Sequence, residues 1–98
     1  MTVRLCVEDN EVRGELALAV PPGTPAARRD RMVDDVLTDP MFDLAAELGV
    51  VLAADPHAYA RPLDGRDEQG RTRFEVRGRT EGGRLMPVKR GKLRARRG

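Results

Sequence analysis

Apolar and polar residues alternate near the start of the chain. Val3, Leu5 and Val7 occupy every second position, and the alternation resumes after Asp9-Asn10. This period of two predicts strands that each bury one face. Because Asp and Asn both tolerate the positive backbone angles of a two-residue loop, we expect residues 3–20 to form a β-hairpin.

Spacings of three and four residues replace this alternation in the next segment. Two apolar stripes fit two helices: Met32, Val33, Val36 and Leu37, and then Met41, Leu44, Ala45 and Leu48. Thr24 and Asp39 each precede a proline, as an N-cap residue often does, and Gly49 suits the left-handed residue that ends a helix. The short link between the stripes predicts an αα-hairpin.

The rest of the chain predicts a strand, a loop and a second hairpin. Val50–Ala53 is too short for a helix and favours a buried central strand. Prolines and glycines predict a loop over Asp55–Gly70. Alternation over Arg71–Arg77 predicts a strand that buries Thr72, Phe74 and Val76, followed by a turn at 78–83 and a returning strand at 84–88.

The expected fold class is therefore α+β. Two hairpins and a short central strand form an antiparallel sheet, an αα-hairpin covers one face, and the domain at 1–88 precedes a basic, flexible tail at 89–98. Residues 44–50 also resemble the first half of a helix-turn-helix DNA-binding motif. Asp55-Pro56 falls where the recognition helix of such a motif would run, and proline removes a backbone donor there.

Composition narrows the classes of function. The chain has one cysteine, Cys6, and one histidine, His57, which is too few for a disulfide or a thiolate-histidine zinc site within one chain. We expect no metal, cofactor, signal peptide or membrane span, and a cytoplasmic location. With only three aromatic residues in 98 positions the core is small, so a homodimer is a further expectation.

Charge is divided unevenly along the chain. Residues 1–60 hold five arginines against eleven Asp and Glu, a net of −6, whereas residues 61–98 carry a net of +8. This asymmetry favours a non-enzymatic protein that contacts nucleic acid, either DNA or RNA, through its C-terminal third. The candidate contact residues are Arg71, Arg73, Arg77, Arg79, Arg84, Lys89, Arg90, Lys92, Arg94, Arg96 and Arg97.

Two alternatives stay open. The first is a protein-interaction module, a small regulator or inhibitor, whose acidic helices meet a basic protein through Asp30, Asp34, Asp35, Asp43 and Glu47. The second is a small ribonuclease-like toxin in which His57 acts as acid or base and arginines stabilise phosphate charge.

Overall fold

The N-terminal hairpin forms as predicted. The computed structural model describes residues 2–88, in which β1 (Thr2–Glu8) pairs antiparallel with β2 (Glu11–Leu18). Asp9 and Asn10 have φ values of 49° and 65°, so the two-residue loop uses the left-handed region that both side chains tolerate. Val12 and Leu16 point to one face and are fully buried, which confirms the alternation.

The two predicted helices are one helix, α1 (Ala26–Leu48), so the αα-hairpin was wrong. Val33, Leu37, Met41 and Ala45 are buried at steps of four residues, and this stripe runs without a break past Pro40. Burying it continuously outweighs the roughly 3 kcal/mol that an interior proline costs. Asp39 is therefore an exposed helical residue rather than a cap.

The two ends of α1 differ from each other. Thr24 does not cap the helix, because its hydroxyl donates to the carbonyl oxygen of Pro21 at 2.6 Å and the helix begins after Pro25. Gly49 ends the helix as predicted, with φ 73° and its N–H bonded to Ala46. The Val50 N–H bonds to Ala45 at 3.0 Å, which completes a Schellman motif. Within the described residues only a strand and a four-residue 3₁₀ helix follow Gly49 before the next strand, and no second α-helix does, so the helix-turn-helix likeness does not extend past the glycine.

The strand after Gly49 lies at an edge of the sheet and not in its centre. β3 (Val51–Leu52) pairs in parallel with β6 (Arg84–Pro87), so the sheet is mixed rather than antiparallel. Val51 remains 62 % exposed. The prediction of a central strand was therefore wrong. After the reversal at Gly49 the apolar run becomes the outermost strand of the sheet, which has a neighbouring strand on one side only.

The predicted loop at 55–70 contains regular structure. It forms a short 3₁₀ helix, η1 (Pro56–Tyr59), and a strand, β4 (Ala60–Arg66), that pairs with β5 (Thr72–Glu81). The pairing shifts register between Pro62 and Arg66. Proline and glycine are tolerated here because β4 is an edge strand with an irregular ladder.

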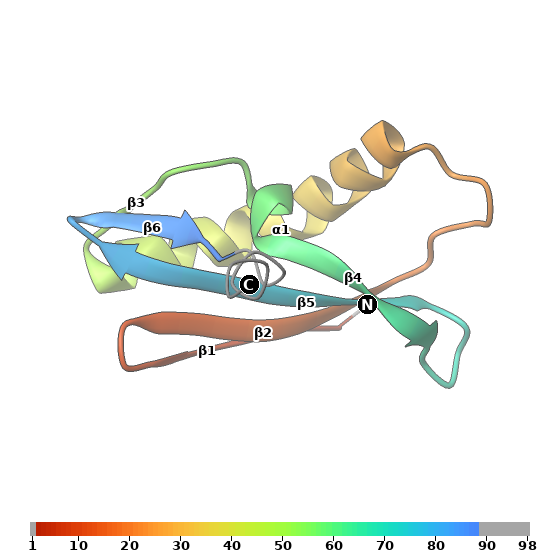
Figure 1. Ribbon diagram of the computed structural model, residues 1–98, viewed down its shortest axis with the longest axis horizontal. Helices are drawn as coiled ribbons and strands as arrows, with labels where there is room; N and C mark the ends of the chain where they lie inside the picture. The colour runs from red at the N-terminus through yellow and green to blue at the C-terminus, as the bar shows by residue number, and fades with distance from the viewer. Residues whose placement is uncertain (1, 89–98) are drawn as a thin grey trace, which may run out of the picture.

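β5 is the central strand of the sheet. The strand order is β1-β2-β5-β6-β3, and β4 and β6 follow each other along the same side of β5 (Figure 1). The second hairpin forms, but β5 extends to Glu81 and only Gly82-Gly83 makes the turn, both with positive φ. The predicted turn at 78–83 was therefore too long.

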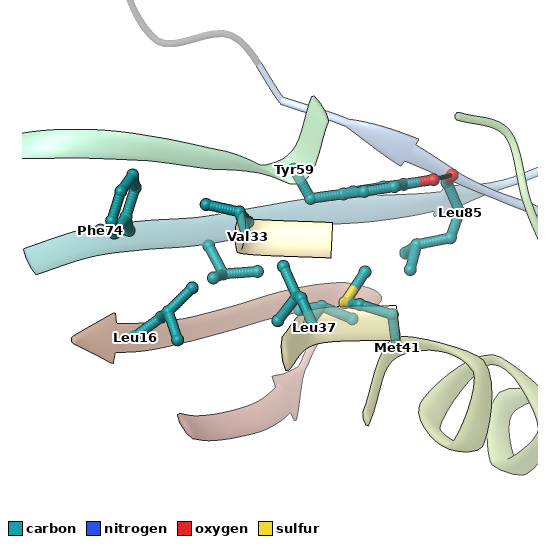
Figure 2. Close-up of a cluster of buried hydrophobic side chains, with 9 residues drawn as sticks. Leu16, Val33, Leu37, Met41, Tyr59, Phe74 and Leu85 are labelled. Carbon is teal, nitrogen blue, oxygen red and sulfur yellow. Dashed lines mark hydrogen bonds between the residues drawn. The ribbon is translucent and has the colours of Figure 1, made fainter. Parts of the chain in front are cut away.

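The helix covers one face of the sheet and the core fills the space between them (Figure 1). Leu37 and Met41 of α1 belong to one buried cluster with Leu16 of β2, Phe74 of β5 and Leu85 of β6 (Figure 2). Gly78 lies in this layer, where an added Cβ would come within 3.2 Å of both Tyr59 and Leu85. The observed class is thus α+β, with one helix in place of two. No helix within residues 2–88 is long and apolar enough to cross a bilayer.

Candidate functional site

The predicted strand arginines lie on the outer face of the sheet, which is the face turned away from α1. Arg73, Arg77 and Arg79 alternate with the buried Phe74 and Val76. Acidic residues lie among these arginines on the same face. Glu11 of β2 lies opposite Arg79, and Glu75 of β5 lies opposite Arg61 of β4. The outer face is therefore a mixture of both charges rather than a continuous positive surface.

Glu11 holds three of the arginines on this face. Arg13 donates to its carboxylate at 3.2 Å, Arg77 lies at 3.2 Å and Arg79 at 3.7 Å. The hydrogen bond from Arg13 is the main cause that lowers the pKa of Glu11, and Arg77 adds to it. Arg77 is only 22 % exposed, so its charge is paired with Glu11 within the fold and little of it faces solvent.

Arg71 also has a structural partner. Its Nε donates to Asp67 at 2.8 Å, and the same carboxylate accepts the backbone N–H groups of Gln69 and Arg71. These bonds close the β4–β5 connection and lower the pKa of Asp67, the backbone bond from Arg71 most of all. Among the strand arginines of the prediction, Arg79 and Arg84 are exposed. The six predicted cations at Lys89, Arg90, Lys92, Arg94, Arg96 and Arg97 lie outside the described residues.

His57 lies beside α1. Its Nδ1 donates to the Asp34 carboxylate at 2.9 Å, its backbone N–H donates to the same group at 2.8 Å, and its Nε2 lies 4.0 Å from Asp30. The hydrogen bond with Asp34 is the main cause that raises the pKa of His57. The ribonuclease alternative requires arginines close to His57. The strand arginines lie on the opposite face of the sheet, so the structure does not bring them to this histidine.

Tyr59 is a core residue that ties three elements together. It is 3 % exposed, and its hydroxyl donates to the Leu85 carbonyl in β6 (Figure 2). The same oxygen accepts the backbone N–H of Ala53 at 3.0 Å. Tyr59 thereby fixes η1 against the residues that follow β3.

The acidic residues of α1 divide into two groups. Asp30 and Asp34 face His57, whereas Asp35 and Asp43 are exposed. Four exposed carboxylates, which we call the carboxylate row, recur at every fourth position of the helix: Asp35, Asp39, Asp43 and Glu47. Residues four apart lie one above the other on a helix, so the carboxylate row is one continuous negative stripe.

A groove separates α1 from the segment 50–56. Its volume is about 810 Å³, and its helix wall includes Thr38, Phe42 and Ala46, each one position before a member of the carboxylate row. Phe42 is 54 % exposed and Val51, on the other wall, is 62 % exposed. Sequence reasoning missed this groove because it placed Val51 in the core. The signal that could have revealed it is the position of Phe42, which lies off the buried stripe of α1.

β3 contributes a free backbone edge to the same region. The N–H groups of Val51 and Ala53 bond to Gly83 and Leu85 on the β6 side. In a parallel ladder the residue between them directs its N–H and C=O to the opposite side, so Leu52 presents both groups away from β6. Within residues 2–88 no strand pairs with that side of β3.

Comparison with known proteins does not assign the chain to a family. Neither protein-family models, nor curated proteins, nor solved structures gave a match. In residues 2–88 no group of three or more His, Cys, Asp or Glu side chains could hold a metal ion.

Proposed function

We propose that the protein is an interaction module that binds a basic, extended segment of a partner protein in the groove between α1 and β3. The observation that carries this proposal is the carboxylate row beside a groove in which Phe42 and Val51 remain exposed. An apolar groove bordered by one sign of charge suits a peptide that combines apolar and basic side chains.

Three kinds of contact support the proposal. The free backbone groups of Leu52 can add a strand to the sheet, which is a common way to bind an extended peptide. Phe42 can cover the apolar side chains of that strand that face α1. Asp39 and Asp43 can attract cationic side chains that alternate with the apolar ones, because neighbouring residues of a strand point in opposite directions.

The same geometry makes nucleic acid the less favoured partner. At the groove a phosphate backbone would be repelled by the carboxylate row, and on the outer face of the sheet Arg71 and Arg77 are held by Asp67 and Glu11. Contact with nucleic acid stays a prediction for Arg73, Arg79, Arg84 and the tail. Its test is the salt dependence of DNA and RNA binding: undetectable binding at low ionic strength would refute it.

A defined peptide tests the interaction module. An acetylated peptide of alternating valine and arginine should bind the full chain, and a valine-glutamate peptide should not. Replacing Asp39, Asp43 and Glu47 by Asn, Asn and Gln should weaken binding about tenfold, since three screened charge pairs contribute roughly 0.5 kcal/mol each. Fluorescence anisotropy would give the Kd.

A matched control separates the groove from the net charge of the protein. Glu8, Glu15 and Glu81 are exposed on strands of the sheet rather than on α1, and their replacement by Gln changes the net charge by the same amount. This control should leave the Kd unchanged. Equal weakening by both triple variants, or no binding of the valine-arginine peptide, would contradict the proposal.

A further inference from the structure

β1 is a regular strand at an edge of the sheet. It runs over Thr2–Glu8 without a proline, a glycine or a shift of register against β2. No strand of residues 2–88 pairs with its other side, and in Figure 1 it lies outermost, below β2. Proline, bulges and charged side chains usually keep such an edge from pairing with another chain. β1 has no proline and no bulge, and its two charges, Arg4 and Glu8, have opposite signs.

The other free edges of the sheet are less suited to a long ladder. β3 has only two residues. β4 contains Pro62 and Gly65 and shifts its register between Pro62 and Arg66, which makes it irregular. Within the part of the chain that the structure describes, β1 is therefore the edge with the longest regular set of unpaired backbone groups.

The turn after β1 determines which of its backbone groups are free. Asp9 and Asn10 both have positive φ, as in a type I′ turn, whose hydrogen bond joins Glu8 and Glu11. Hydrogen-bonded and non-hydrogen-bonded pairs alternate along an antiparallel ladder, so every second residue of β1 bonds to β2. The residues between them direct their N–H and C=O groups to the free side: Val3, Leu5 and Val7.

The same three residues are apolar and incompletely covered. Their side chains point to the face of the sheet that α1 covers, because their partners in β2 include the buried Val12 and Leu16. Val7 is 41 % exposed, and Val3 and Leu5 are half-buried. A strand added on the free side would cover apolar surface and pair the free backbone groups at the same time.

β1 is complementary to a second copy of itself in the antiparallel direction. When Leu5 lies opposite Leu5 of the second copy, Val3 of each strand lies opposite Val7 of the other. All three residues with free backbone groups then form hydrogen bonds between the copies. Apolar side chains meet only apolar side chains on the face that α1 covers, which makes a second copy the occupant that fits this edge.

The charges favour the same register. Arg4 lies opposite Cys6 of the second copy and diagonal to its Glu8, within reach of a long side chain. A shift by one residue would set side chains of opposite faces against each other. A shift by two residues would set Arg4 against Arg4 in one direction. In the other direction it would set Val3 against Asp9, whose φ of 49° places it in the turn.

We infer that two copies of the chain join through β1, in antiparallel register centred on Leu5, to form one continuous sheet. Both α1 helices lie on the same face of that sheet, because opposed side chains of an antiparallel pair share a face. The inference goes beyond the proposed function, since β3 and its groove lie at the other end of the strand order. It assigns a surface to the homodimer that the small core led us to expect. One strand pair is a small interface, so the Kd should be on the order of 10 μM.

Sedimentation equilibrium under reducing conditions tests the dimer. The full chain should show a monomer–dimer equilibrium between about 1 and 300 μM, a range that brackets this Kd. Val7→Pro removes an N–H on the free side and none from the β1–β2 ladder, and it should raise the Kd at least about tenfold. Val7→Thr keeps the N–H and the branched shape, so this matched control should still dimerise. A monomer at all concentrations, or equal weakening by both variants, would overturn the inference.

Exchange of the two charges provides a test without proline. Arg4→Glu or Glu8→Arg alone sets like charges across the interface and should raise the Kd roughly three- to tenfold. The double variant restores opposite charges and should bring the Kd back towards that of the unchanged chain. Within one copy, residues 4 and 8 are about 13 Å apart along the strand, so only contact with a second copy explains such a recovery. A double variant as weak as the single variants would overturn the inference.

Disulfide trapping tests the register. In a Cys6→Ser background, which leaves no other thiol, Leu5→Cys places two Cα atoms about 5.5 Å apart across the dimer, a separation that a disulfide spans. A mild oxidant should convert this variant into covalent dimers. The matched control is Val51→Cys in the same background, because Val51 also lies on an edge strand and is 62 % exposed, so random collisions favour it. No trapping at position 5, or equal trapping at position 51, would overturn the inference.

Discussion

Removing the hydroxyl of Tyr59 tests how the groove wall is held. In Tyr59→Phe the ring remains, but the hydrogen bonds to the Leu85 carbonyl and from the Ala53 N–H are lost. These two backbone groups also bond to each other at 3.1 Å, so neither is left without a partner. The expected loss in the free energy of unfolding is therefore about 1–1.5 kcal/mol, the net value of a hydrogen bond, without an added desolvation penalty.

The assay is urea denaturation followed by far-UV circular dichroism, together with hydrogen exchange at Ala53. For a domain of this size, each 1 kcal/mol lowers Tm by about 4–8 °C. Tyr59→Ala serves as the comparison, because it also removes the buried ring and should cost roughly 3–5 kcal/mol. A loss above about 3 kcal/mol in Tyr59→Phe would show that the backbone groups do not satisfy each other. No measurable loss would show that the hydroxyl does not hold the wall.

Three further predictions concern the core, the histidine and the groove. Gly14→Ala should lower the free energy of unfolding by about 3 kcal/mol, because a Cβ there clashes with a backbone carbonyl of β1. Gly78→Ala should lower it by about 1 kcal/mol, because a Cβ there meets only side chains, at 3.2 Å. Equal losses of the two variants in urea denaturation would contradict this. The pKa of His57 is raised in the folded state, so its pairing with Asp34 stabilises the fold fully below the ordinary value of 6.5, and this contribution disappears as pH rises through the raised pKa. His57→Gln should therefore flatten the fall of stability with pH measured by denaturation, and parallel curves for the two proteins would refute the reasoning. Phe42→Ala should change the free energy of unfolding by less than about 1 kcal/mol, since the side chain is 54 % exposed. The same variant should raise the Kd of the valine-arginine peptide in anisotropy measurements. An unchanged Kd would show that Phe42 does not contact the peptide.

The candidate site could be predicted only in part. The acidic residues of α1 were recognised from their spacing, but their separation into a carboxylate row and a pair facing His57 depends on where η1 packs. The arginines of β5 were placed on the correct face. Their partner Glu11 lies 66 positions from Arg77 along the chain, and no local pattern indicates which strand lies beside β5.

The sequence by itself determined the local features of this protein. The Asp9-Asn10 turn, the glycine stop at Gly49 and the alternation around Phe74 each depend on a few neighbouring residues, because turn and cap geometry and side-chain direction are properties of adjacent backbone. Tertiary structure decided whether a proline could lie inside a helix and whether an apolar residue became buried. Pro40 lies inside a helix because a continuous stripe is buried against the sheet, and Val51 stays exposed because β3 is the last strand. Burial is set by contacts between segments distant in sequence, and it is burial that left a groove beside the carboxylate row.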